Sequence, residues 1–185
     1  NYKSCNIIRN NSFVEMAVSP GANFFLNNIF SNNGFSFSAN WANIDINTPN
    51  YYGTSSSLNL SKKIRDFLTN SSLGVINMST FLTIPSSDAH GIVWKVLVNG
   101  KDAQDEYELM DPVGIGTHQF DVYFNRAMDT NYPPQISYGV RDPYNQKIIS
   151  EKGTWSPDGK IYTVSHEVKI GVADGVNRIR VQGAR

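Results

Sequence analysis

Regular alternation of apolar and polar residues in the second half of the chain constrains the fold more than any other sequence feature. Successive side chains of a β-strand point to opposite faces, so a period of two predicts a strand with one buried face. The clearest case is the stretch 120–129, where the apolar positions Phe120, Val122 and Phe124 alternate with Asp121, Tyr123 and Asn125. We expect these three apolar side chains to face a core, and Arg126 to Asp129 to form an outer turn.

The same period recurs in several other runs of the second half. Turn sequences such as Asn99-Gly100 and Ser156-Pro157-Asp158-Gly159 separate them. The alternating runs span residues 92–98, 135–139, 162–170 and 178–182. Many short strands divided by turns, without segments of helical period, predict an all-β chain with a β-sandwich in residues 86–185.

Residues 1–50 have a different composition, with 13 Asn but only four charged residues. Within them the run 7–13 aligns with the run 24–30 at an offset of 17 residues (27 − 10 = 17), and 43–47 fits a degenerate third copy. One such unit cannot bury its apolar face alone, whereas stacked copies can, which is the logic of a solenoid. An Asn-rich meander of antiparallel strands is the alternative for residues 1–50.

A closing segment follows these repeats. The sequence predicts a helix over residues 61–68, which would cover the open end of the stack. Its apolar face would consist of Leu60, Ile64, Phe67 and Leu68, with Ser57 or Ser61 as the N-cap. Short strands are expected at 75–78 and 81–82, and residues 85–88 are the expected linker between two domains.

Two resemblances to known protein types rest on these motifs. The Asn-Asn-x-Phe motifs at 10–13 and 27–30 resemble the last coils of a right-handed parallel β-helix. The ordered set formed by residues 98–100, 120–129, 155–163 and 173–181 resembles bacterial Ig-like modules of large secreted and surface proteins. The resemblance implies a β-helix end with a short capping helix, followed by an Ig-like β-sandwich that serves as a spacer, support or adhesive unit. The two-Cys bridge of antibody-type domains is absent from this sequence.

No set of residues forms a catalytic signature, and we expect no enzyme activity. Glu15 and Asp45 are the acids of residues 1–50, and nothing in the sequence brings them together as the paired carboxylates of a glycosidase. The single cysteine, Cys5, is better interpreted as a small core residue than as a nucleophile.

We also expect no metal and no cofactor. The histidines, His90, His118 and His166, lack the spacing of zinc ligands. The acidic run of Asp102, Asp105, Glu106, Glu108 and Asp111 could bind Ca²⁺, but it lacks the glycine of the twelve-residue calcium loop. A solvated loop is the favoured interpretation of this run.

Aromatic side chains are the candidates for ligand binding, because an exposed ring can stack on a sugar. The candidate sugar-stacking residues are Trp41, Tyr51, Tyr52 and Tyr144. Tyr144 is the best of them, since it lies between Pro143 and Asn145 in an expected turn.

The charge balance limits the partners. A formal net charge of +0, from 16 basic and 16 acidic residues, argues against a nucleic-acid interface. No apolar run approaches the roughly 20 residues of a membrane helix. Residues 1–4 show no signal-peptide pattern, and we expect the chain to be a piece of a larger secreted or surface polypeptide.

We therefore expect a non-catalytic structural or glycan-attachment part of an extracellular bacterial protein, with polysaccharide and the upstream polypeptide as partners. Two alternatives remain open. The chain could be the C-terminal portion of a β-helix polysaccharide lyase or glycoside hydrolase whose active site lies mostly upstream. It could also be a subunit of a surface assembly, held by pairing of edge strands.

Overall fold

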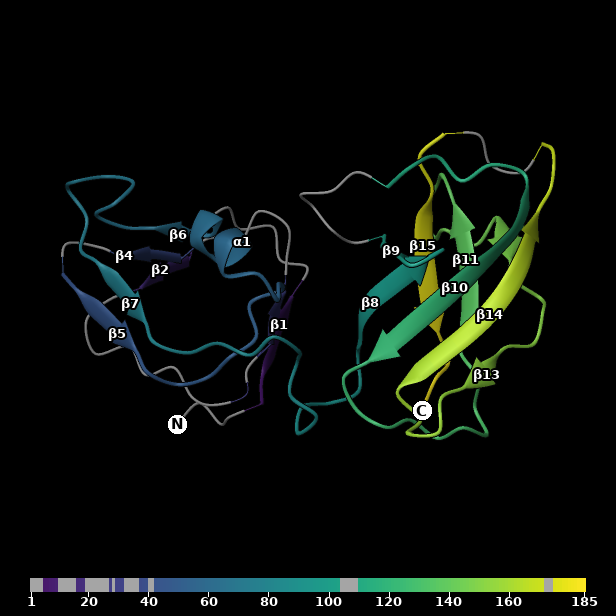
Figure 1. The fold of residues 1–185 in the computed structure, drawn as a ribbon, viewed down its shortest axis with the longest axis horizontal. Coiled ribbons are helices and arrows are strands. Elements are labelled where there is room, and N and C mark those ends of the chain that lie inside the picture. Colours follow the sequence, from purple (N-terminus) through teal and green to yellow (C-terminus); the bar gives the residue numbers. More distant parts are fainter. Residues whose placement is uncertain are drawn as a thin grey trace. The chain divides into compact units, whose positions relative to one another are not determined.

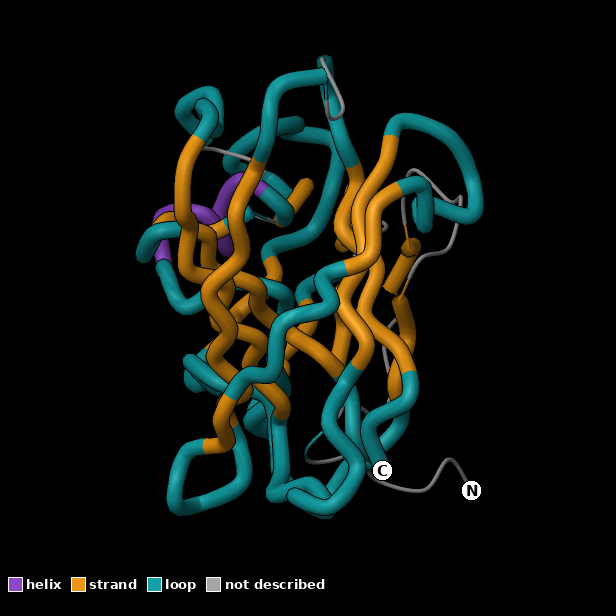
Figure 2. Tube along the Cα trace, turned by 90° about the vertical axis from the view of Figure 1, so that its right-hand side faces the viewer, coloured by secondary structure: helices purple, strands orange, loops and turns teal. Residues whose placement is uncertain are grey.

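The computed structural model describes residues 5–9, 16–18, 27, 29–31, 37–39, 42–103, 110–171 and 175–185. The chain forms two compact units, Asn1–His90 and Gly91–Arg185. The sequence places this boundary after residue 85, whereas the structure divides the chain after His90. Apart from one short helix, the elements of the described ranges are β-strands, so the prediction of an all-β chain is confirmed (Figure 2).

Parallel pairing characterises the first unit. Its elements are β1 (Ile7–Arg9), β2 (Met16–Val18), β3 (Ile29–Ser31), β4 (Phe37–Ala39), β5 (Ile44–Ile46), α1 (Ser57–Lys62), β6 (Ile64–Arg65) and β7 (Ile76–Met78). Every strand pair described in this unit is parallel: β1 with β3, β2 with β4, β4 with β6, and β5 with β7.

These strands belong to three small sheets that the chain visits in a fixed order. Strands β3, β4 and β5 each lie in a different sheet. The chain then returns to the same sheets in the same order, through the bridge of Tyr51 to Ile29, then β6, then β7. The chain therefore advances by one strand in each sheet per circuit.

The register of these pairs contradicts the predicted repeat of 17 residues. Ile7 pairs with Ile29, an offset of 22 (29 − 7 = 22), rather than with Phe24. The offset was misjudged because the alignment used Asn pairs and aromatic residues, whereas the buried Ile29 occupies the position that pairs with Ile7. Asn10, Asn11, Phe13 and Asn28 lie outside the described residues.

Apolar packing lies on one side of β5 and β7, and a polar ladder lies on the other. Phe30 stacks on Tyr52 with 5.5 Å between ring centroids, in a core completed by Ile44, Ile46, Leu60 and Ile76. On the exposed side, Asn77 donates to Asp45 over 2.8 Å and Ser79 donates to Asn47 over 3.3 Å. Side-chain hydrogen bonds between neighbouring strands thus reinforce the backbone pairing.

The sequence predicts a helix over residues 61–68, but the structure places it at Ser57–Lys62. Helix α1 begins after Ser56, whose hydroxyl accepts a hydrogen bond from the Asn59 amide and acts as the N-cap. It ends at Lys62 because Ile64 and Arg65 pair with β4 as strand β6. Phe67 and Leu68, predicted on the apolar face, are consequently exposed.

Asp66 holds the loop that follows β6. Its carboxylate is buried, and it accepts hydrogen bonds from the amide of Leu68 over 3.0 Å and from the amide of Ile76 over 3.2 Å. The same side chain therefore fixes the loop and joins it to the first residue of β7. A buried amide without its acceptor is costly, so this carboxylate stabilises the last circuit of the unit.

We predict that Asp66→Ala destabilises this region by about 1–3 kcal/mol, because two amides lose their acceptor. Hydrogen exchange measured by NMR should become faster at Leu68 and Ile76. The control is Asp45→Ala, which removes an exposed carboxylate of the ladder and should leave both amides protected. Unchanged protection of Leu68 and Ile76 in Asp66→Ala would contradict this role.

The second unit consists of two antiparallel sheets. The five-stranded sheet has the order β13 (Thr154–Trp155), β14 (Ile161–Val168), β10 (Gly116–Phe124), β8 (Val93–Val98) and β9 (Lys101–Asp102). The three-stranded sheet has the order β12 (Lys147–Ile148), β11 (Gln135–Gly139) and β15 (Arg178–Gln182). Figure 1 shows β11 and β15 behind the sheet of β8, β10 and β14.

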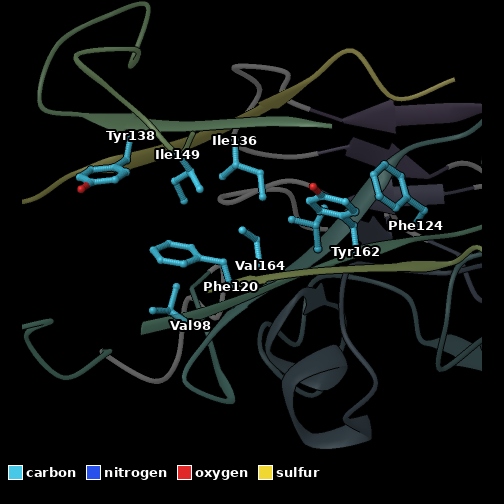
Figure 3. Packing of buried hydrophobic residues seen from close by; sticks show 9 residues of the cluster. Val98, Phe120, Phe124, Ile136, Tyr138, Ile149, Tyr162 and Val164 are labelled. Carbon is cyan, nitrogen blue, oxygen red and sulfur yellow. The ribbon is translucent and has the colours of Figure 1, made fainter. Parts of the chain in front are cut away.

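The two sheets share one apolar core and form a β-sandwich. Figure 3 shows Phe120, Phe124 and Val164 of the larger sheet pointing toward Ile136 of the smaller sheet and toward Ile149. The predicted inner face of β10 is confirmed, since Phe120, Val122 and Phe124 are at most 4% exposed. Arg126, Ala127 and Asp129 are exposed and lie outside the strands, as expected for an outer turn.

Alternation does not extend to the end of the run 162–170, because β14 ends at Val168 and Ile170 is 83% exposed. Asp121 keeps to the outer face of the sheet, opposite Thr163, but it is buried there. Its carboxylate accepts hydrogen bonds from Thr163 over 2.7 Å and from Gln119, which compensates for the lost contact with water.

We predict that Phe120→Ala destabilises the second unit by about 3–5 kcal/mol, because it leaves a cavity between the sheets. Urea unfolding followed by the amide NMR signals of residues 116–124 measures this loss. Ile170→Ala, which shortens an exposed side chain, should leave the midpoint unchanged. Equal midpoints for Phe120→Ala and the wild type would refute the assignment of Phe120 to the core.

Candidate functional site

Tyr51 and Tyr52 do not fit the predicted sugar-stacking role. They are 4% and 2% exposed, so neither ring offers a face to a ligand. Burial raises the pKa of Tyr52 to about 12, although a hydrogen bond from Asn50 lowers it in part. The sequence did not reveal this burial, because Tyr51 pairs with Ile29 through an isolated bridge that no periodic pattern marks. Trp41 lies outside the described residues.

Tyr144, the remaining candidate, lies in the loop that connects β11 and β12. Its backbone has a φ of 59°, in the left-handed region, and its ring is half-buried. Two hydrogen bonds fix the backbone: its amide donates to the Arg141 carbonyl over 2.7 Å, and its carbonyl accepts from the Ser137 hydroxyl over 3.0 Å. The loop is thereby tied to the outer face of the three-stranded sheet.

Two arginines of β15 contact this loop. Arg178 donates to the Tyr144 hydroxyl over 3.1 Å, and its guanidinium lies 5.3 Å from the centre of the Tyr144 ring. Arg180 donates to the Pro143 carbonyl over 3.2 Å. Both side chains are therefore positioned by the Tyr144 loop rather than extended freely into solvent.

The strand itself explains why these arginines lie on the outer face. Ile179 and Val181 pack against the core, so their neighbours Arg178, Arg180 and Gln182 point away from it. Gln182 is exposed and donates to Gln135 on the neighbouring strand β11. We name the set Arg178, Arg180, Gln182, Gln135 and Tyr144 the β15 face.

Arg178 and Arg180 give the β15 face a positive charge. Within the part of the chain that the structure describes, neither Arg178 nor Arg180 forms an ion pair with a carboxylate. Each uses one nitrogen for the contact with the Tyr144 loop, and a guanidinium has five N–H donors. The β15 face can therefore donate several further hydrogen bonds to a ligand. The alternation of residues 178–182 predicted a strand, but the pairing with Tyr144 depends on a loop conformation that the sequence does not specify.

A second polar cluster joins the two sheets of the sandwich. The hydroxyl of Tyr138, on β11, lies 3.0 Å from Nε2 of His166, on β14. Nδ1 of His166 lies 2.9 Å from the carboxylate of Glu151. An ionised carboxylate only accepts, so Nδ1–H of His166 donates to Glu151, and in the neutral ring Nε2 accepts from Tyr138.

Electrostatics in this cluster are coupled. Burial, followed by the charge of Glu151, raises the pKa of Tyr138. Partial burial opposes ionisation of Glu151, but the hydrogen bond and charge of His166 outweigh it and lower the pKa of Glu151 below its ordinary value of 4.5. The His166 ring also lies edge-on to Phe120 and Tyr138. His166 therefore packs on a strand face and also connects the two sheets.

A third group lies on the other face of the five-stranded sheet. Trp94 and Tyr123 make an edge contact with 6.1 Å between centroids, and the ammonium of Lys95 lies within 6 Å of both rings. A register shift in the pairing of β8 with β10 displaces Trp94 from regular alternation. Burial, followed by the charge of Asp121, raises the pKa of Tyr123. Trp94, Lys95 and Tyr123 thus pack against one another on this partly exposed face.

The acidic run of residues 102–111 lies partly within the described ranges. Asp105, Glu106 and Glu108 lie outside the described residues, while Asp111 forms an ion pair with Lys101. Across the described ranges, no group of three or more His, Cys, Asp or Glu side chains is placed to hold a metal ion. No helix in those ranges has the length and apolar character needed to cross a membrane.

Comparison with known proteins gives no relative. The chain matches no protein-family model, no curated protein and no solved structure.

The Glu151 pKa leads to a prediction about pH. Because the folded-state pKa is lower than the unfolded-state value, ionised Glu151 stabilises the fold above pH 4.5, and this contribution is lost as the pH falls through the folded-state pKa. We predict that Glu151→Gln lacks this part of the pH dependence.

Urea midpoints of the second unit, measured from pH 7 to pH 3, test this expectation. Between the wild type and Glu151→Gln, the difference in midpoint should be largest near neutral pH and should vanish in acid. Glu167→Gln, which changes an exposed carboxylate on the same strand as His166, is the control. A constant difference across the range would exclude ionisation of Glu151 as its source.

Proposed function

We propose that this chain is a non-catalytic structural and glycan-attachment part of a larger extracellular bacterial protein. In this proposal the first unit is the closing end of a right-handed parallel β-helix, capped by α1. The second unit is an Ig-like sandwich that holds a polysaccharide on its surface.

Support for the β-helix comes from the order of the sheets. The chain passes through three parallel sheets in a repeating order, and the β5–β7 pair carries a polar ladder with a constant spacing of 32 residues. Strands of two or three residues cannot bury a face alone, so they need the next circuit for stability. Such an array is suited to support rather than to movement.

Several carboxylates of the described residues have structural partners, which favours a non-catalytic role. Asp66 accepts from two backbone amides, Asp121 accepts from Thr163 and Gln119, and Asp158 accepts from Ser156 and from the Lys160 amide. The Ser156 contact, followed by the Lys160 amide, lowers the pKa of Asp158. These acids hold loops and strands in place.

The attachment role is carried by one observation, the β15 face. It combines a half-buried aromatic ring with exposed amide and guanidinium donors on a rigid strand. Saccharides are bound by such a combination, since rings stack on the apolar faces of sugars while donors reach their oxygens. A site on a strand is also held more firmly than a site on a loop alone.

We predict that the purified chain is retained by a polysaccharide in affinity electrophoresis and releases no product from it. Tyr144→Ala should weaken retention several-fold. Tyr132→Ala is the matched control, because Tyr132 also lies against an arginine, Arg185, at a different place on this unit.

Release of new reducing ends or unsaturated sugars in proportion to protein concentration would overturn the non-catalytic proposal. Failure to retain any polysaccharide, neutral or acidic, would overturn the attachment role. Equal retention by Tyr144→Ala and the wild type would remove the β15 face from the proposal.

A further inference from the structure

The β15 face carries a stronger indication of its ligand than a general affinity for sugars. Arg178 and Arg180 are separated by one residue on a strand, so their Cα atoms lie about 7 Å apart on the same face. Both charges belong to a chain whose formal net charge is +0. The positive charge of this face is therefore local, and it does not reflect a generally basic protein.

Each guanidinium is held before any ligand arrives. The Tyr144 hydroxyl and ring fix Arg178, and the Pro143 carbonyl fixes Arg180. Ordering a long side chain on binding costs about 0.5–1.5 kcal/mol, and an arginine that is already positioned avoids part of this cost. The contacts with the loop thus prepare the remaining N–H groups for an acceptor.

The chemistry of the acceptor follows from the donors. A guanidinium presents parallel N–H groups in a planar fork, which matches the two oxygens of a carboxylate. Gln182 and Gln135 extend the same face with amide groups that suit sugar hydroxyls. A ligand that carries carboxylates and hydroxyls along a chain fits this arrangement.

We infer that the β15 face binds an acidic polysaccharide through the carboxylates of its uronate residues, which accept hydrogen bonds from Arg178 and Arg180. The inference rests on the proposed glycan-attachment function and names the class of its ligand. Tyr144 is a positioning residue, because it acts on the ligand mainly through Arg178. No covalent bond is made or broken in this binding.

The test is calorimetric titration of the full chain with an oligogalacturonate and with the same oligomer after methyl esterification of its carboxyl groups. Esterification removes the charge but keeps the sugar backbone. We expect the acidic oligomer to bind at least about tenfold more tightly, since a charge-assisted hydrogen bond contributes about 1.5–3 kcal/mol. Higher salt should weaken this binding.

Variants locate the site. Arg178→Ala and Arg180→Ala should each weaken binding about tenfold or more, whereas Arg126→Ala, which removes an exposed arginine from the 126–129 corner, should have no effect. Arg180→Lys keeps the charge but not the fork, and it should bind less tightly than the wild type. Because Ile179 and Val181 make the core contacts of β15, these substitutions should leave the NMR spectrum of the core unchanged.

Each contrary result has a distinct meaning. Equal affinity for the esterified and acidic oligomers would overturn the uronate inference and leave the attachment function in place. Binding of dextran sulfate or DNA as tight as that of the uronate would also overturn it, because charge alone would then explain the affinity. Absence of binding to acidic and neutral glycans alike would overturn both proposals. Weakening by Arg126→Ala equal to that by Arg178→Ala would place the ligand elsewhere.

Discussion

Strand β10 is the element on which the second unit depends. It pairs with β14 from Gly116 to Tyr123 on one side and with β8 from Phe120 to Phe124 on the other, and its inner side chains form the middle of the core. Since a strand alternates its faces, commitment of Phe120, Val122 and Phe124 to the core constrains the register of β14, and that of β8 up to the shift between Tyr123 and Phe124. The same rule acts across the core on β15, where burial of Ile179 and Val181 directs Arg178 and Arg180 outward. The proposed binding face is therefore a consequence of the packing.

The first unit follows a different constraint. Its described strands have two or three residues, too few to form a stable sheet alone, and each depends on the strand of the next circuit. Stability there is shared between a narrow apolar core and polar side chains such as Asp66 and the Asp45–Asn77 ladder. The two units thus reach an all-β structure by parallel stacking in one case and antiparallel pairing in the other.

The sequence predicts those features that local periodicity controls. The longer strands of the second unit (β8, β10, β11, β14 and β15), the inner face of β10 and the Asn99-Gly100 turn, whose residues have φ values of 52° and 81°, follow from spacing and turn chemistry, whereas the two-residue strands β9, β12 and β13 do not. Features set by distant partners were not. The predicted helix is misplaced because Ile64 pairs with β4 as part of a strand. The predicted repeat offset is wrong because the register of β1 and β3 is set by the pairing of Ile7 with Ile29. Of the β15 face, the sequence predicts only Tyr144 as a site residue. The contact between Arg178 and Tyr144 joins residues far apart in the chain, so no local sequence pattern marks it.

The central claim is that the β15 face holds an acidic glycan without chemical change. An NMR titration of the isotope-labelled chain with an oligogalacturonate tests it most directly. The account predicts progressive shifts at residues 178–182 and at Tyr144 and Gln135, with unchanged signals for the buried Val122 and an intact oligosaccharide at the end of the titration. Shifts confined to other parts of the chain, no shifts at saturating ligand, or shortened oligosaccharide would contradict it.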